Sequence, residues 1–171
     1  MEETNDRQFF EDFVHRYTGR ALAYCRTRLG ADDAEEVVQD VMVKLFSRVE
    51  RLRAMEEPLP YLYRALRNAL VDRLRSHKGR VQLDDVTAQG LAAKPVEAHE
   101  AKNELSLARA MEGLPEDLRE LLELRYFEEM SVEQVAEVLE ISAAATAMRL
   151  ARARVKLKDE LARLGVKSLD M

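Results

Sequence analysis

The segment SVEQVAEVLEISAAATAMRLARARVKLK, residues 131–158, decides the fold of the C-terminal part of this chain. Its first half places apolar side chains at helical spacing, and Ser131 followed three residues later by Gln134 has the pattern of a capping box. Ser142 offers a second N-cap after a short break that follows Leu139. We therefore expect two helices joined by a tight corner.

The second of these two helices is strongly basic. Between Ser142 and Lys158 the sequence has five basic residues and no acidic one, whereas residues 114–140 have nine acidic residues and two basic ones. Because the positive charge is confined to one helix beside an acidic segment, we expect this helix to bind an anionic partner. A short apolar helix, a corner and a basic helix form the pattern of a helix-turn-helix, so the segment predicts DNA binding.

The composition is that of a helical protein that does not insert into a membrane. Of the 171 residues, 47% are apolar and 35% are charged, and the chain contains six glycines and four prolines. No apolar run approaches the roughly 20 residues that cross a bilayer. The acidic N-terminus is unlike a secretory signal, and the single cysteine, Cys25, has no partner for an internal disulfide. We expect a cytoplasmic protein.

The net charge of −5 hides a second cationic segment. Residues 61–80 carry six basic side chains and one acidic side chain, Asp72. No glycine-rich phosphate loop, zinc-ligand cluster or Ser/His/Asp set is apparent, and His15 and Cys25 have no further ligand-type neighbours. The sequence therefore predicts no enzyme activity, no metal site and no cofactor, but two separate basic surfaces on an acidic body.

Helical periodicity extends over most of the chain. We expect a first helix from about Thr4 that ends at Gly30, and a second over residues 34–52 that Asp32 or Asp33 caps. A third should begin at Tyr61, with Leu74 on its inner side and Tyr63 on its outer side.

Residues 81–98 have no sustained period, so we interpret them as a flexible linker. After this segment we expect helices over residues 100–113 and 115–130, followed by the basic pair. Leu164 should end the inner stripe of the last helix. The predicted fold class is all-α, with two small helical domains, residues 1–80 and 99–171, the second of which contains the helix-turn-helix.

Three motifs in register resemble one protein family. AEEVVQDVMVKLF (34–46) is similar to its core-binding helix, and PYLYRALRNALVDRLR (60–75) is similar to its next helix. GLPEDLRELLELRYFEEMSVEQVAEVLEIS (113–142) and RLARARVKLK (149–158) resemble its C-terminal domain. The family is the extracytoplasmic function (ECF) type of RNA polymerase sigma factor, and the resemblance covers nearly the whole chain.

The resemblance implies a sigma factor that binds core RNA polymerase and directs promoter-specific transcription initiation. It implies a polymerase-binding face with these residues: Glu35, Glu36, Gln39, Asp40 and Lys44. It places the melted minus-ten strand beside these residues: Arg64, Arg67, Asn68, Arg73 and Arg75. It places the minus-thirty-five duplex against these residues: Ala144, Ala145, Met148, Arg149, Arg152, Arg154 and Lys156. An anti-sigma factor is a further partner of many family members.

The chain departs from the family where the last helix begins. Members usually have a run such as GTVKSRL, and this chain has ATAMRL at residues 145–150 after Ala144. An alanine and methionine tip offers few hydrogen bonds to base edges, although apolar side chains contact thymine methyl groups. We therefore expect a relaxed or T-rich upstream element, with Arg149 as the residue that contacts a base. Tyr61 replaces the usual tryptophan, and Glu56 and Glu57 occupy the loop that captures a flipped base in the family.

Two alternative functions are left open by the residues. An ordinary helix-turn-helix regulator would explain the C-terminal half but not the 34–46 motif. A sigma-like interaction module that sequesters an anti-sigma factor would explain both halves and the apolar tip. Co-purification with core polymerase separates the first alternative from a sigma factor, and transcription with purified core polymerase separates the second.

Overall fold

The computed structural model describes residues 2–78 and 98–166, and over these residues the chain is helical and has no strand. Its residues fall into two compact units, Met1–Leu91 and Ala92–Met171. This confirms the prediction of an all-α chain with two helical units. Residues 81–97 of the predicted linker lie outside the described residues, and residue 98 already belongs to a helix.

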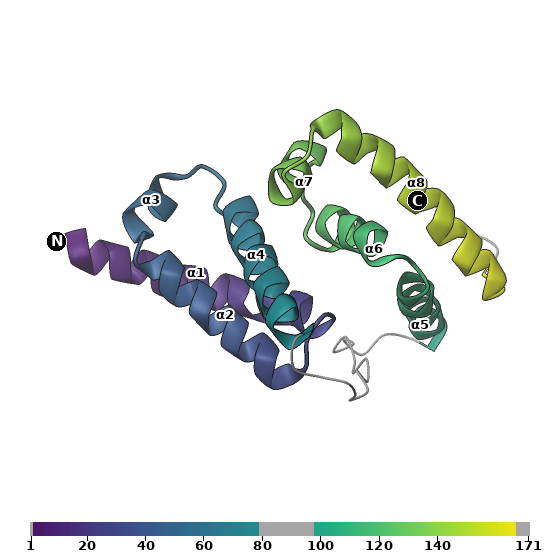
Figure 1. Cartoon of the computed structure of the whole chain (residues 1–171), viewed down its shortest axis with the longest axis horizontal. Helices are drawn as coiled ribbons and strands as arrows, with labels where there is room; N and C mark the ends of the chain where they lie inside the picture. The colour runs from purple at the N-terminus through teal and green to yellow at the C-terminus, as the bar shows by residue number, and fades with distance from the viewer. Residues whose placement is uncertain (1, 79–97, 167–171) are drawn as a thin grey trace. The chain divides into compact units, whose positions relative to one another are not determined.

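The N-terminal unit contains four helices, α1 (Glu2–Arg26), α2 (Ala31–Phe46), α3 (Val49–Ala54) and α4 (Leu59–Lys78). Figure 1 shows α1 and α2 side by side, and α4 packs against both. Their shared core contains Val41, Leu52, Leu62 and Leu66, which are all buried. Burial of these side chains is the main source of stability for helices of this length.

The structure corrects two predictions about α2. The second helix ends at Phe46 rather than at Leu52, because Ser47 and Arg48 turn the chain and α3 then packs Leu52 against α1 and α2. Neither Asp32 nor Asp33 caps α2. The N-cap is Gly30 without a side-chain hydrogen bond, and both carboxylates lie in the first turn, where the helix dipole favours them.

Two side chains of α4 lie on the other side of the helix from the one that the sequence predicted. Tyr63, expected on the outer side, is fully buried, and its ring meets Tyr24 edge-on with centroids 5.1 Å apart. Because α4 begins at Leu59 and its inner side faces both α1 and α2, the buried sector includes position 63. Leu74, expected inside, is exposed because it lies beyond that contact.

The C-terminal unit contains α5 (Ala98–Glu112), α6 (Glu116–Leu122), a π-helical turn η1 (Glu123–Phe127), α7 (Val132–Leu139) and α8 (Ala143–Arg163). The long α8 packs against α5, α6 and α7, and these are the green to yellow helices of Figure 1. A single continuous helix over residues 115–130 was predicted, and this is wrong because η1 widens its last turn. The inner stripe of α8 is buried as expected up to Leu161, but Leu164 is exposed.

Candidate nucleic-acid and protein interfaces

The corner between α7 and α8 has the local geometry that the sequence predicted. The hydroxyl of Ser131 accepts from the backbone N–H of Gln134, whose side chain accepts from the backbone N–H of Ser131, which completes the capping box. Ser142 caps α8 by accepting from the backbone N–H of Ala145 at 3.1 Å. Both confirmed caps satisfy backbone donors that a helix start leaves open.

The chain leaves α7 through a Schellman motif. The backbone N–H of Ile141 donates to the carbonyl of Ala136 at 3.1 Å, and that of Glu140 donates to the carbonyl of Glu137 at 3.4 Å. The motif requires a left-handed residue, and Glu140 adopts φ 55° and ψ 42°. A glutamate at this position carries a steric cost that a glycine would not.

The solvent side of α8 presents two parallel lines of side chains. Positions spaced by three or four residues share one side of a helix. The first line is mainly cationic and contains Ala145, Arg149, Arg152 and Lys156, of which Ala145 is half-buried and the other three are exposed. The second line is apolar and contains Ala144, Met148, Ala151 and Val155, all exposed; Met148 is 71% exposed and Val155 is 60% exposed.

Arg154 lies apart from these two lines, on the flank of α8 that faces η1. Its Nε donates to the hydroxyl of Tyr126 at 2.5 Å, and its guanidinium lies 5.7 Å from the centre of that ring. The guanidinium of Arg125 lies 5.6 Å from the centre of the same ring and also donates to the backbone carbonyl of Met130 at 3.1 Å. The structure therefore does not bring Arg154 together with Arg149, Arg152 and Lys156.

The outer side of α4 gathers most of the residues predicted to meet a melted strand. Tyr61, Arg64, Asn68 and Arg75 recur at spacings of three, four and seven residues, so they share one side of the helix. Asn68 and Arg75 are exposed, and Tyr61 and Arg64 are half-buried. Arg67, also half-buried, lies next to this side rather than on it. An aromatic ring with amide and guanidinium groups is a suitable surface for bases and phosphates.

Arg73 belongs to a different surface. Its Nη2 lies 2.9 Å from Glu36 and its Nη1 lies 3.5 Å from Asp33, both on α2. One helical turn further, His77 approaches the other oxygen of Asp33 at 3.5 Å. The hydrogen bond to Glu36 and the nearby carboxylates raise the pKa of Arg73 above its usual value. Arg73 therefore bridges α4 to α2 and lies on the opposite side of α4 from Asn68.

Two arginines that the sequence did not single out join Tyr61. Arg48 precedes α3 and donates from Nη1 to the Tyr61 hydroxyl at 3.2 Å. Arg51 on α3 and Arg64 on α4 place their guanidinium groups 5.8 and 5.9 Å from the centre of the same ring. The cluster was missed because the predicted second helix continued through residue 52, which gives no reason to place α3 beside Tyr61.

The predicted protein-binding residues all lie on the exposed surface of α2. Glu35, Glu36, Gln39, Asp40 and Lys44 are exposed, although two of them already have intramolecular partners. Glu35 accepts from Arg26 at 3.2 Å, and Glu36 pairs with Arg73. Along the outer side of α2, Glu36 and Gln39 are followed by Val43 and Phe46, so this side changes from acidic to apolar toward the C-terminal end of the helix.

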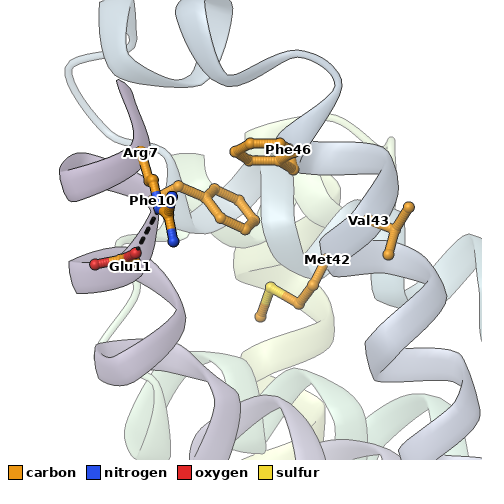
Figure 2. A pocket seen from close by; sticks show the side chains of 6 residues that line it. All are labelled: Arg7, Phe10, Glu11, Met42, Val43 and Phe46. Carbon is orange, nitrogen blue, oxygen red and sulfur yellow. Dashed lines mark hydrogen bonds and ion pairs between the residues drawn. The ribbon is translucent and has the colours of Figure 1, made fainter. Parts of the chain in front are cut away.

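An apolar pocket of about 420 Å³ lies between α1 and α2 at this apolar end. Figure 2 shows Phe10 and Phe46 close together in its lining, and their ring centroids are 5.0 Å apart. The ion pair of Arg7 with Glu11, at 3.0 Å, lies at its rim. Val43 is 70% exposed and Phe46 is 50% exposed, and both line the pocket, so together they form an exposed apolar surface.

Metal-ligating and thiol side chains form no further candidate site in the described residues. Within residues 2–78 and 98–166, no group of three His, Cys, Asp or Glu side chains is arranged to hold a metal ion. Burial raises the pKa of the Cys25 thiol to about 12, so this thiol is not reactive at neutral pH. No helix in the described parts of the chain is long and apolar enough to cross a membrane.

Comparison with known proteins identifies both units. Residues 13–80 match the family described as Sigma-70 region 2, and residues 104–157 match Sigma-70, region 4. SigV of Bacillus subtilis (strain 168), an RNA polymerase sigma factor, is 30% identical over 141 residues, which cover 82% of this chain and 81% of SigV. The chain belongs to the ECF family of RNA polymerase sigma factors.

Other relatives of this ECF sigma factor agree with that assignment. The ECF sigma factor SigW of the same organism is 26% identical over 91% of this chain and 90% of SigW. A probable RNA polymerase sigma factor, RfaY of Xanthomonas campestris pv. campestris, is 34% identical over 84% of this chain, which spans 38% of the length of RfaY.

Two solved structures have the same fold as this ECF sigma factor. CnrH in complex with the cytosolic domain of CnrY has a TM-score of 0.59 at 25% identity, covering 95% of this chain and 91% of CnrH. The sigma factor RpoE of Bartonella quintana, in complex with the anti-sigma factor NepR, has a TM-score of 0.73 at 19% identity, covering 94% and 99% of the two chains.

Family membership decides between the functions that the residues left open. Sigma factors are transcription initiation factors that bind core RNA polymerase and promoter DNA. The region 2 match spans α2 and α4, which a plain helix-turn-helix regulator does not explain. The region 4 match contains α7 and most of α8, in agreement with the helix-turn-helix expected from the sequence.

Proposed function

We propose that this chain recruits core RNA polymerase to promoters in the cytoplasm as a non-enzymatic ECF sigma factor. The observation that carries the proposal is the order of surfaces: an acidic-to-apolar face on α2 and cationic faces on α4 and α8, within regions 2 and 4. Run-off transcription with purified core polymerase on a library of genomic fragments tests it. Transcripts from a defined set of fragments are expected, and binding to core polymerase without any transcript would contradict it.

We propose that residues 1–80 bind polymerase and the melted strand, and that residues 99–171 recognise the upstream element. Residues 81–98 would connect the two. Support comes from the two family matches, which leave residues 81–103 between them.

Core polymerase would bind the outer side of α2. The proposed residues are Glu35, Glu36, Gln39, Asp40 and Lys44, and we extend the surface to Val43, Phe46 and the pocket beside them. An acidic surface that ends in an apolar pocket suits a basic segment that also presents a large apolar side chain. The ion pair between Glu36 and Arg73 holds one of these carboxylates in a fixed position before the partner arrives.

The melted minus-ten strand would bind the outer side of α4, through Arg64, Asn68 and Arg75, with Arg67 at its edge. We leave Arg73 out of this set because it pairs with α2 carboxylates on the inner side of the helix. Fluorescence anisotropy of a labelled non-template strand with the holoenzyme provides the test. Weaker strand binding is expected for Arg64→Gln and Asn68→Ala, and unchanged binding for both variants would refute the assignment.

The minus-thirty-five duplex would bind α8 through the line of Ala145, Arg149, Arg152 and Lys156, with Ala144 and Met148 at the tip. Arginine and lysine side chains anchor the helix to phosphates, and the apolar tip contacts thymine methyl groups. Arg154 is excluded because Tyr126 holds it on another flank. We therefore infer a relaxed or T-rich upstream element.

Arg149 is the residue that we assign to a base. The test compares binding of Arg149→Ala with the unmodified chain across randomised upstream sites. Loss of preference at one position of the site is expected, with a discrimination of about 1–3 kcal/mol for a well-made base contact. Uniform weakening on every sequence would mean that Arg149 contacts only phosphates.

We also propose an anti-sigma factor as a second partner of this chain. Support comes from CnrH, which shares the fold and was solved with the cytosolic domain of another protein bound. The exposed apolar line of α8 and the α2 pocket are surfaces that such a protein could cover. In-vitro transcription separates this regulated sigma factor from a module that only sequesters an anti-sigma factor, because the module would start no transcripts.

A further inference from the structure

Tyr61 holds three guanidinium groups around one exposed edge of the N-terminal unit. Its hydroxyl accepts from Arg48 at 3.2 Å, and its ring lies 5.8 Å from the guanidinium of Arg51 and 5.9 Å from that of Arg64. The three arginines come from two elements, since Arg48 and Arg51 lie at and within α3 while Arg64 belongs to α4. The turn at Ser47 and Arg48 is what brings the two elements together.

Three like charges around one ring repel each other unless an anion lies between them. The attraction of a guanidinium to an aromatic face offsets part of this repulsion but leaves most hydrogen-bond donors of each arginine available. Other arginines of this unit have carboxylate partners instead, for example Arg53 with Asp6 at 2.6 Å and Arg73 with Glu36 at 2.9 Å. The surroundings of Tyr61 are therefore those of an anion site rather than of a structural ion pair.

The cluster continues the outer side of α4. Arg64 belongs both to the cluster and to the line that contains Asn68 and Arg75. Phosphates of a single strand repeat along its length, so a strand that follows this line toward the start of α4 reaches Arg48 and Arg51 next. Guanidinium groups recognise phosphate oxygens through paired N–H donors.

We propose that Arg48 and Arg51 together with Arg64 form a phosphate clamp for single-stranded DNA. Tyr61 is its positioning residue, because it holds Arg48 through its hydroxyl and the other two arginines through its ring. The inference rests on the proposed binding of a melted strand at α4 and adds α3 to that site. It identifies the ligand as the sugar–phosphate backbone, so the clamp contributes affinity without base preference.

The experiment measures binding of a labelled single strand by the holoenzyme over a range of salt concentrations. Each phosphate contact in a single strand contributes about 0.7 to the slope of log K against log salt. The variant Arg48→Gln/Arg51→Gln should therefore lower that slope by about 1.4. A matched control, Arg16→Gln/Arg109→Gln, removes two charges from exposed positions outside the clamp and should leave the slope unchanged.

A conservative pair of substitutions separates charge from fold. Arg48→Lys/Arg51→Lys keeps both positive charges, so it should restore the slope even though a lysine cannot make paired contacts to one phosphate. Tyr61→Leu should weaken strand binding, because the three arginines are then free to separate. This variant keeps all three charges, so the salt slope should fall by less than in the double glutamine variant. A double glutamine variant that binds the strand with an unchanged slope would overturn the proposal.

Three further outcomes distinguish the clamp from the function on which it rests. If Arg64→Gln and Asn68→Ala bind strand normally, the strand site on α4 is wrong and the clamp falls with it. If these variants bind strand weakly while Arg48→Gln/Arg51→Gln binds normally, only the clamp is wrong. If the double variant loses affinity for core polymerase instead of for DNA, α3 is a polymerase contact and the proposal is also overturned.

Discussion

Val43 provides the sharpest test of the proposed polymerase surface. Its side chain is 70% exposed on the outer side of α2, beside the pocket formed with Phe10 and Phe46. Replacement by aspartate removes few contacts within the folded chain, so the fold should be retained. A carboxylate at this position would instead be carried into the interface with the partner.

The expected loss of affinity follows from the exposed area. Full burial of a valine side chain contributes about 1.5 kcal/mol at the lower end of its range, so burial of the exposed 70% contributes about 1 kcal/mol. Burial of an unpaired carboxylate at an interface costs at least about 2 kcal/mol more. Val43→Asp should therefore weaken binding of core polymerase by about 3 kcal/mol, or about 150-fold, whereas Val43→Ala should weaken it only about fivefold.

Biolayer interferometry with immobilised core polymerase measures these affinities. The matched control is Ala23→Asp, because Ala23 is also exposed and also lies three residues before the end of its helix, α1. Circular dichroism melting checks that both variants remain folded. Equal affinities for Val43→Asp and Ala23→Asp would show that the outer side of α2 at Val43 does not bind core polymerase.

Three further predictions concern other parts of the chain. Arg73→Ala should leave the salt slope of strand binding unchanged because Arg73 pairs with Glu36. Arg64→Gln should lower the same slope by about 0.7. If both variants lower the slope equally, Arg73 belongs to the strand site. Glu140→Gly should stabilise the corner by about 0.5–1 kcal/mol, because glycine adopts the left-handed backbone at this position without steric cost. Glu137→Gly, within α7, should destabilise the corner by about 1 kcal/mol. Hydrogen exchange of α7 and α8 amides measures both effects. Burial raises the pKa of the Cys25 thiol from 9.0 to about 12, so this thiol ionises at lower pH in the unfolded chain than in the folded chain. The free energy of unfolding should therefore fall between pH 9 and pH 12. Urea unfolding measures this decrease, which should be smaller for Cys25→Ala.

Local patterns predicted the C-terminal unit better than the N-terminal unit. Ser131, Gln134 and Ser142 interact with backbone groups three residues away, so sequence spacing alone is sufficient to place both caps. The break after Phe46 has no such local signal. It depends on the packing of Leu52 against α1 and α2, which is a contact between distant residues.

The same distinction applies to the candidate sites. Residues that share one side of a helix, such as Arg149 and Arg152, follow from a period of 3.6 residues. That period does not tell whether a basic side chain is available to bind DNA, because its intramolecular partner can lie on another element. Arg73 meets Glu36 and Arg154 meets Tyr126, and neither pair has a regular spacing. The Tyr61 cluster was missed for the same reason, since Arg48 reaches the ring across a turn.

The two helices that we propose to face DNA, α4 and α8, should divide affinity and specificity unequally. Around the tip of α8, Ala144 and Met148 offer methyl and thioether groups, so cations further along the helix would supply most of its binding energy through phosphates. Such binding discriminates poorly among duplex sequences, because hydrogen bonds to base edges carry most sequence information. Asn68 on α4 presents an amide that can both donate to and accept from an unpaired base. Promoter choice by this sigma factor should therefore depend more on the melted strand at α4 than on the upstream duplex at α8.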